Sequence, residues 1–434
     1  MKFGRSLGFL AALVSALCVG ALLSVAVTTK SYSESYPAVV CPPTISGLTS
    51  QISLTSKKTP FQRLQNRTTK TAPVKVLRLP VNKDSLLFNS EGVAPVVWQS
   101  KASSWAGGAV CTGPATSQWF VGGTADITTR GRLMIVNSGL SDAVVDVQSF
   151  TENGKQPVRT ITVVSKNYIV IPTDSLAPGD KYLTVHVAPR SGRVNAFMID
   201  EQSKGLRSLG GDLVNSASTP TKSLLIPAIP NQIIKNTKTL PHTLRVLSPG
   251  DVDASVTAEV LSADGVFVPV GLTSRTVNAG IVTEFQFTPK ITSTVLAIRI
   301  TSTEPVVAAI KSTVTVSGRK DFVWSTSAPE LVPLTIAISG LTPLISFAGD
   351  QINVSLDVTM NNGKVIRKTI KGTDIATWRA PDAARSFTIT KVGPDTFAGA
   401  LVSSVNGYGY FPIAPGSLLT KIELPDSNIR VLNP

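Results

Sequence analysis

Histidine, serine and carboxylate side chains are the groups of this 434-residue chain that could do chemistry. The two histidines, His186 in YLTVHVAP and His242 in LPHTL, stand in unrelated contexts, and neither has a metal-ligand companion nearby in the sequence. A general base needs a partner that orients it. No HExxH, CxxC, GxSxG, P-loop or dinucleotide-binding glycine motif occurs. The sequence therefore predicts no catalytic residue, no metal site and no cofactor.

One Ser-x-x-Lys tetrad, from Ser317 to Lys320, resembles the start of a penicillin-binding active site. That chemistry needs further Ser/Asn and Lys-Thr-Gly elements. Here Gly318 between strand-like runs indicates a surface turn instead. Asp142 and Asp253 each precede a strand-like run, which favours a turn or strand-entry role. A carboxylate pair for glycoside cleavage has no sequence motif. A cell-wall polysaccharide enzyme therefore remains an alternative.

Three of the five tryptophans, Trp98, Trp105 and Trp119, cluster around Cys111 in the sequence. Flat aromatic faces could stack on sugar rings, but the strand-like WFVGG segment favours a place in a sandwich core. Trp324 and Trp378 are isolated and are interpreted as core residues too.

The N-terminus carries Lys2 and Arg5 before an uncharged run of 21 residues, 7–27, which is about the thickness of a bilayer core. By the positive-inside rule, the run predicts a single-pass anchor in the cytoplasmic membrane, with a cytoplasmic N-terminus and an extracytoplasmic C-terminal bulk. A cleaved signal peptide, and thus a secreted protein, is the alternative, because Ser24 and Ala26 have the spacing of a cleavage site.

Cys18 lies inside this apolar run, so Cys41 and Cys111 are the two cysteines on the exported side. In an oxidising exterior they predict a disulfide, whose closure of about 70 residues would stabilise the fold by roughly 4 kcal/mol. Two unpaired buried cysteines are the other interpretation.

Residues 31–71 are rich in Ser, Thr and Lys and predict a partly extended stalk. The densest basic tract overlaps it and contains no acidic residue; its cations are Lys57, Lys58, Arg63, Arg67, Lys70, Lys75, Arg78 and Lys83. The tract either contacts anionic lipid or wall polymer, or is a solvated tether. A Cys41–Cys111 bond would close it into a loop near the first folded domain, which favours local binding. The net charge of +14 also fits nucleic acid, but export disfavours that partner.

Beyond the tract the sequence repeats itself. Residues 132–154 align without a gap on 243–265, and residues 182–197 align on 295–310, where His186 matches Arg299. A weaker third copy spans 353–363 and 386–402. Asn153-Gly154, Asp264-Gly265 and Asn362-Gly363 fall between alternating runs and suit tight hairpins.

The sequence thus predicts an all-β fold of tandem immunoglobulin-like or fibronectin-like β-sandwich repeats after one N-terminal transmembrane helix. The expected boundaries are 1–30 for the anchor or signal peptide, 31–71 for the stalk, and 72–220, 221–328 and 329–434 for three sandwich units.

The N-terminal span, the CTGPATSQWFVGG segment at 111–123 and the repeated pattern together resemble an uncharacterised family of secreted or membrane-anchored actinobacterial proteins, a domain of unknown function. The resemblance implies a cell-envelope setting and a gene position near a large membrane glycosyltransferase. The predicted function is a non-catalytic envelope scaffold or binding module for another envelope protein or a glycan. An accessory subunit of a membrane glycosyltransferase is a second alternative.

Overall fold

The computed structural model describes residues 13–15, 18, 39–66, 68–89, 92–235 and 238–416. The chain divides into one unit formed by Met1–Tyr36 with Leu419–Pro434 and a second unit, Pro37–Leu418. In the first unit, residues 13–15 and 18 are helical. Among the described residues no helix is long and apolar enough to cross a membrane. Most of the predicted anchor, 7–27, lies outside the described residues.

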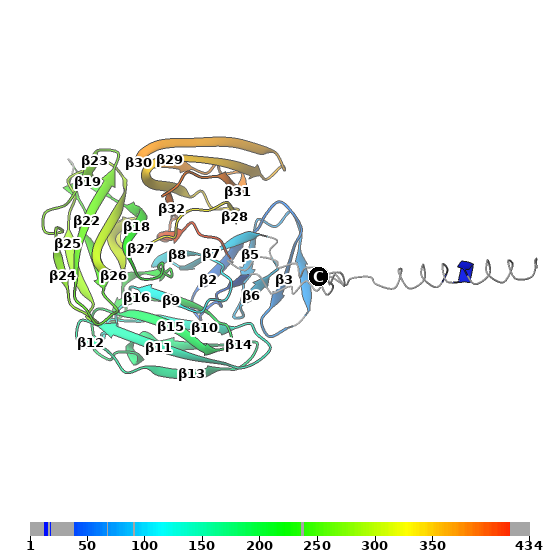
Figure 1. The fold of residues 1–434 in the computed structure, drawn as a ribbon, viewed down its shortest axis with the longest axis horizontal. Helices are drawn as coiled ribbons and strands as arrows, with labels where there is room; N and C mark the ends of the chain where they lie inside the picture. Colours follow the sequence, from blue (N-terminus) through cyan, green and yellow to red (C-terminus); the bar gives the residue numbers. More distant parts are fainter. Residues whose placement is uncertain are drawn as a thin grey trace, which may run out of the picture. The chain divides into compact units, whose positions relative to one another are not determined.

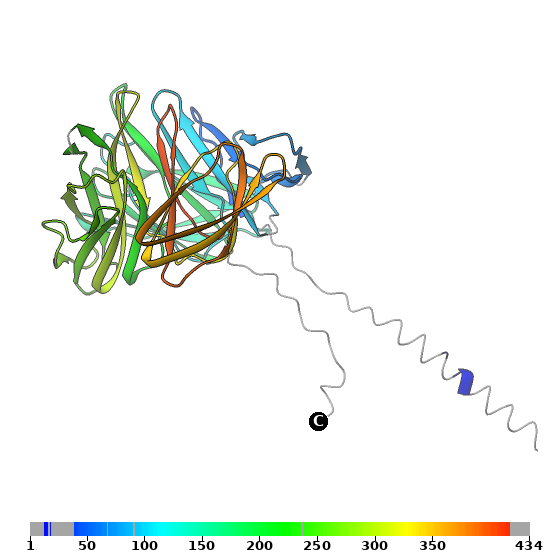
Figure 2. The same ribbon diagram turned by 90° about the horizontal axis from the view of Figure 1, so that it is seen from above.

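The second unit is nearly all β-structure, as predicted, with one short 3-10 helix, η1 (Thr173–Ser175). Its strands fall into four consecutive groups, and Figure 1 shows β7 and β8 of the first group near the middle. Figure 2 gives the same strands in a view turned by 90°, with the long curved β29–β30 hairpin crossing in front.

The first group forms two four-stranded layers, β1-β6-β3-β4 and β5-β2-β7-β8. Its strands are β1 (Val39–Cys41), β2 (Thr49–Ser53), β3 (Thr59–Arg63), β4 (Thr69–Ala72), β5 (Arg78–Val81), β6 (Leu86–Phe88), β7 (Val93–Lys101) and β8 (Trp105–Val110). The stalk predicted over 31–71 is therefore wrong for the described residues from 39 onward. Phe61 and Leu64 of this segment are buried in a core, which an extended tether would not provide. Because β2 pairs with both β5 and β7, the boundary expected at 71/72 divides one set of paired strands.

The second group again has two layers, β14-β10-β16-β17 and a sheet in which β11 lies beside β12, β13 and β15, and β15 beside β9. Its strands are β9 (Gln118–Val121), β10 (Arg132–Asn137), β11 (Ala143–Thr151), β12 (Gly154–Lys155), β13 (Arg159–Val163), β14 (Asn167–Pro172), β15 (Thr184–Ser191), β16 (Asn195–Lys204) and β17 (Arg207–Val214).

The third group repeats these pairings, with a single 22-residue strand, β26, standing where the second group has β15 and β16. The first part of β26 pairs with β18 and β22, and its second part pairs with β21 and β27. The strands are β18 (Thr221–Pro230), β19 (Ile233–Lys235), β20 (Lys238–Thr239), β21 (His242–Leu247), β22 (Ala254–Ser262), β23 (Gly265–Phe267), β24 (Arg275–Val277), β25 (Thr283–Phe287), β26 (Val295–Val316) and β27 (Arg319–Thr326).

The fourth group adds the order β33-β32-β29-β31-β28, with β30 beside β29. Its strands are β28 (Leu334–Ala337), β29 (Leu344–Met360), β30 (Val365–Arg379), β31 (Ala384–Lys391), β32 (Phe397–Ser403) and β33 (Tyr408–Pro412). Strand β28 pairs in parallel with β7, so the last group and the first share one ten-stranded sheet.

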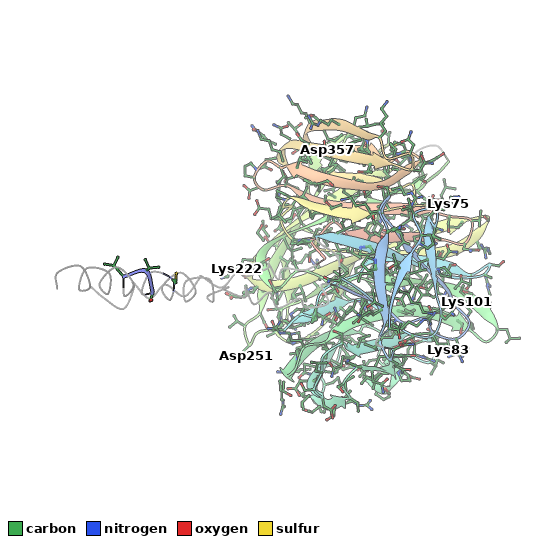
Figure 3. The ribbon with its side chains drawn as sticks, turned by 90° about the vertical axis from the view of Figure 1, so that its right-hand side faces the viewer. Lys75, Lys83, Lys101, Lys222, Asp251 and Asp357 are labelled. Carbon is green, nitrogen blue, oxygen red and sulfur yellow. A yellow bond between two sulfur atoms is a disulfide. The ribbon has the colours of Figure 1, made fainter. Side chains whose placement is uncertain are left out.

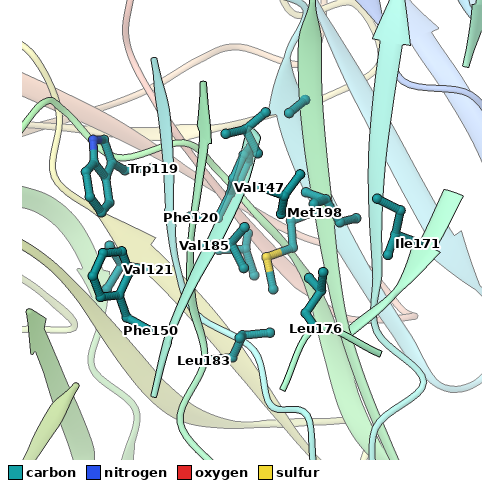
Figure 4. Packing of buried hydrophobic residues seen from close by; sticks show 14 of the residues in the cluster. Trp119, Phe120, Val121, Val147, Phe150, Ile171, Leu176, Leu183, Val185 and Met198 are labelled. Carbon is teal, nitrogen blue, oxygen red and sulfur yellow. The ribbon is translucent and has the colours of Figure 1, made fainter. Parts of the chain in front are cut away.

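Alternate residues along each strand point to opposite faces of its sheet, and the apolar face of each layer packs against the other layer to form a core. In β11, Ala143, Val145 and Val147 are buried while Val144 and Asp146 are partly exposed. Figure 4 shows side chains of the two layers meeting in this core, with Phe150 near Trp119 and Met198 facing Leu176. The predicted turn glycines are also correct: Gly154, Gly265 and Gly363 all have positive φ, which glycine adopts at little cost.

Candidate functional site

The structure bonds Cys41 to Cys111, with 4.5 Å between their Cα atoms. The predicted disulfide is confirmed, and the alternative of two unpaired cysteines is wrong. Cys41 is in β1 and Cys111 directly follows β8, so the bond joins the two layers of the first group. Backbone hydrogen bonds in both directions between the neighbouring Val40 and Thr112 close the same junction.

The eight predicted cations are spread over both layers of the first group rather than along one strand. Lys57 and Lys58 precede β3, Arg63 ends β3, Lys70 is in β4 and Arg78 begins β5. Lys75 and Lys83 lie in loops on either side of β5, well apart in Figure 3, and Arg67 is outside the described residues. All five lysines are exposed, and their role in binding anions stays a prediction.

Arg78, like Arg63, is a member of the tract that the fold partly buries. Its Nη1 donates to Gln51 Oε1 at 3.0 Å, and burial lowers the pKa of its guanidinium. Gly340 approaches it so closely that an added Cβ there would lie 2.8 Å from Arg78 Nε. Arg78 thus packs the first group against the fourth.

The two histidines hold strands together. His186 Nε2 and Ser117 Oγ share a hydrogen bond of 2.8 Å. The His186 ring stacks on Trp119, with 4.0 Å between the ring centroids. This position is partly buried, not fully outward as its alignment with Arg299 suggested, and burial lowers its pKa. The sequence alignment of the two repeats agrees with the strand pairing. His186 lies opposite Gln148, and Arg299 lies opposite Glu259, the residue that aligns with Gln148.

His242 is buried, with Nδ1 2.9 Å from Ser312 Oγ and Nε2 3.2 Å from Asn231 Oδ1. Burial lowers its pKa to about 4. Nε2 must donate to the amide oxygen, so the ring is the neutral Nε2–H form, and Ser312 donates to Nδ1. It is therefore a satisfied core residue.

The remaining motif residues occupy turns and cores. Ser317 and Gly318 have positive φ and form the turn between β26 and β27, as predicted for the Ser-x-x-Lys tetrad. Asp142 Oδ1 accepts from the Ser165 amide, and Asp253 Oδ1 accepts equivalently from the Ala279 amide, both at 2.8 Å.

Four of the five tryptophans are buried in the cores. They are Trp98, Trp105, Trp119 and Trp324, and Trp378 is partly buried. Trp105 and Trp324 are 0% exposed, so neither presents a face to a sugar.

A polar centre that the sequence did not reveal lies where the inner strand of each group meets the others. These four strands, β8, β17, β27 and β33, are called the central strands below. A Cβ added to Gly107 of β8 would lie 2.6 Å from Leu213 N of β17, and one added to Gly409 of β33 would lie 2.7 Å from Gly108 N of β8. Only glycine permits such close backbone approach.

Hydrogen bonds tie the central strands together. Asn215 Nδ2 donates to the carbonyls of Gly108 and Tyr410, at 3.0 and 2.8 Å. The Tyr410 hydroxyl donates to the Thr326 carbonyl at 2.7 Å. Asp212 Oδ2 accepts from the Trp324 amide at 2.7 Å, which links β17 to β27.

Three buried aspartate side chains lie in this centre. Asp212 is fully buried, and burial, with the nearby Asp321 and Asp200 carboxylates, raises its pKa well above the ordinary value. Asp321 Oδ1 accepts from the amides of Gly211 and Phe322, yet burial raises the pKa of this carboxyl to about 7. Asp200 accepts from Trp324 Nε1 at 2.8 Å. The bonded oxygens hold backbone, indole and amide N–H groups, while Asp321 Oδ2 is buried without a partner among the residues that the structure describes. None of the three aspartates lines a described cavity.

Arg245 joins the third group to the second. Its Nη1 donates to the carbonyls of Gly123 and Leu183, at 2.6 and 2.8 Å, while Nε and Nη2 bind Glu284. Its guanidinium lies 4.7 Å from the Trp324 ring. The fold tolerates this buried arginine because Nε, Nη1 and Nη2 of its guanidinium all donate hydrogen bonds. Within the described residues, no group of three or more His, Cys, Asp or Glu side chains could hold a metal ion.

The layers and the central strands define an all-β protein in which successive two-layer groups meet through their inner strands. The chain belongs to a family of unknown function, DUF5719, whose model matches residues 93–370. The match is consistent with the uncharacterised family that the sequence resembles. It runs from the start of β7 into β30.

No curated protein matches the sequence. A solved structure titled "Crystal Structure of Thermotoga maritima 1070" is similar to part of the chain, at 16% identity over 25% of this chain and 95% of that one, with a TM-score of 0.19. A similarity at this level supports no argument about fold or function.

Proposed function

We propose that this chain is a non-catalytic, membrane-anchored extracytoplasmic protein of the cell envelope, which acts as a scaffold or binding module for another envelope protein or a glycan. The observation that carries the proposal is the Cys41–Cys111 disulfide. Structural disulfides persist in oxidising compartments and are rare in the reducing cytosol. The bond therefore supports export. Two basic residues, Lys2 and Arg5, followed by the uncharged run 7–27 support a membrane anchor.

The four groups are, in this proposal, versions of one immunoglobulin-like or fibronectin-like sandwich unit. A recurrent junction supports this: in the first three groups, the opening strand is bridged to the segment that follows the central strand. The bridges are Val40 to Thr112, Trp119 to Ala217 and Leu225 to Ala328. Together with the β7–β28 pairing, this gives a rigid body suited to presenting surface groups.

The use of the buried charges favours a scaffold over an enzyme. Asp212 and Asp321 accept from backbone amides of neighbouring strands, and Arg245 donates to two backbone carbonyls and to Glu284. An active-site carboxylate needs access to substrate in a concave site. An accessory role beside a membrane glycosyltransferase is one form that the scaffold could take, and co-purification from detergent-solubilised membranes tests it.

A reporter fused after Pro434 tests the location. We expect an exported phosphatase reporter to be active and the fusion to remain with membranes after a carbonate wash. The matched control is the same fusion without residues 1–30, which should be inactive and soluble. An inactive reporter on the full chain would contradict the proposal. Recovery of active fusion in the medium would support cleavage near Ser24 and Ala26 instead of an anchor.

A further inference from the structure

A cavity of about 590 Å³ lies between the first and second strand groups. Its walls come from the loop before β2, the β7–β8 turn, the start of β10 and the β16–β17 hairpin. None of the eight cations of the predicted basic tract lines it. The volume is within the usual range for small-molecule sites, about 300 to 1,000 Å³, and far exceeds the space of one simple ion.

The charged side chains on these walls are Lys101, Arg130, Arg132 and Glu201. Lys101 Nζ and Glu201 Oε1 form an ion pair at 2.5 Å, so these two charges offset each other. Neither arginine has a carboxylate within ion-pair distance among the described residues. The cavity therefore keeps the positive charge of two guanidinium groups.

Both guanidinium groups are held in place by the chain itself. Arg130 Nη1 donates to the Thr129 carbonyl at 2.8 Å, and Arg132 Nη1 donates to the Gly131 carbonyl at 2.7 Å. An arginine has five N–H donors in a fixed plane, so each keeps donors for a ligand. Anchoring lowers the entropy that would be lost when a ligand orders the side chain.

Hydroxyl groups and a rigid turn complete the cavity. Ser104 Oγ donates to Ser208 Oγ at 2.6 Å across the two hairpins. The β7–β8 turn is closed by the Ser104 amide on the Lys101 carbonyl at 3.0 Å, and the Ser103 amide donates to Asn406 Oδ1 at 3.3 Å. In Figure 3, Lys101 marks this region between the labels of Lys75 and Lys83.

We propose that this cavity binds a phosphate ester, with Arg130 and Arg132 donating to the phosphate oxygens and the rest of the cavity accommodating a polyol or sugar. Arginine matches phosphate because its planar donors bind two oxygens at once. The same phosphate chemistry could come from a lipid headgroup or from a soluble polyol-phosphate polymer. This inference rests on the proposed binding function, but it requires neither the anchor nor export.

The test titrates the purified protein, with its disulfide intact, with sn-glycerol 3-phosphate and with phosphatidylcholine vesicles containing or lacking phosphatidylglycerol. We expect Arg130→Gln/Arg132→Gln to weaken binding at least about 10-fold, because the double substitution removes the charge-assisted hydrogen bonds to the phosphate. The matched control, Lys57→Gln/Lys58→Gln, removes two cations of the basic tract and should bind like the wild type. Unchanged melting of both variants shows that folding is intact.

Glu201→Gln provides a gain-of-function variant. It releases Lys101 from its ion pair and should tighten binding several-fold, which a misfolded protein would not do. Tighter binding to glycerol phosphate than to vesicles identifies a soluble ligand, and the reverse identifies a lipid headgroup. No binding of either probe, or equal loss in the Lys57/Lys58 control, would overturn the site. Neither result would alter the reporter activity that tests the proposed function.

Discussion

Between β10 and β11 of the second group, the layers meet through Leu133, Ile135, Val145 and Val147, whereas β8 and β17 meet through glycine backbone. In the first region, buried apolar side chains from the two layers pack together and exclude water. In the second, hydrogen bonds and close backbone contacts leave no space for even one carbon atom. The core of a group thus follows from the alternation of apolar and polar residues, while the joining of groups depends on particular small and polar residues.

The largest effect is expected at the disulfide, which ties Cys41 in outer strand β1 of the first group to Cys111 at the end of central strand β8. Cys111→Ser should lower the free energy of unfolding by roughly 4 kcal/mol and the melting temperature by several degrees, because it removes a constraint on about 70 residues of the unfolded chain. Thermal melts measure this. Cys18→Ser, at a cysteine outside the bond, is the control and should melt like the wild type. Equal melting of all three proteins would show that the bond contributes nothing to stability.

The glycine contacts give the next effect. Gly107→Ala places a Cβ 2.6 Å from Leu213 N and 2.7 Å from Asp212 Oδ1, and a strand must shift. We expect a loss of about 1–3 kcal/mol in urea unfolding, the usual cost of overpacking. Gly250→Ala is the matched control, because its Cβ would meet nothing within 4 Å and its φ is not positive. That variant should stay within about 0.5 kcal/mol of the wild type. Equal stability of the two variants would mean that the central strands yield easily.

The difference between the apolar cores and the polar centre also explains which features the sequence could predict. Alternation in residues 143–148 and the turn glycines at 154, 265 and 363 are local signals, so the all-β fold, the hairpins and the disulfide pair were accessible. The strands of 39–72 were missed because they are short, and exposed Ser, Thr and Lys obscure their alternation. Phe61 and Leu64 were the available signal of burial there.

The polar centre had no local signal at all. Asp212 follows the pair Gly210-Gly211, and Gly107-Gly108 follows Trp105, but a sequence does not show that these segments meet. Asp200, Asp212 and Asp321 come together only through the packing of β16, β17 and β27. The cavity beside Arg130 and Arg132 is formed between two groups and was missed for the same reason.

The most specific effect is the pH dependence of the polar centre, whose change over any one pH unit is the smallest of the three. Burial raises the pKa of Asp321 to about 7, above the ordinary value of 3.8. Between these values the folded protein keeps a proton that the unfolded chain has released, so this group makes wild-type stability fall as pH rises from about 4 to 7. Asparagine does not titrate. The stability of Asp321→Asn relative to the wild type should therefore increase by on the order of 1 kcal/mol per pH unit in this window and stay constant above it.

Urea unfolding of both proteins at intervals from pH 4 to 8 measures that difference, in which contributions from all other groups largely cancel. The exchange is close to isosteric, and the amide oxygen can still accept from the Gly211 and Phe322 amides that Asp321 Oδ1 binds. Asp251→Asn, at an exposed loop position, is the control and should show no such trend. A pH-independent difference for Asp321→Asn would mean that its carboxylate is charged and stabilised in the folded protein. Asp321 would then hold the Gly211 and Phe322 amides as a charged carboxylate, rather than as the protonated carboxyl group that its raised pKa indicates below pH 7.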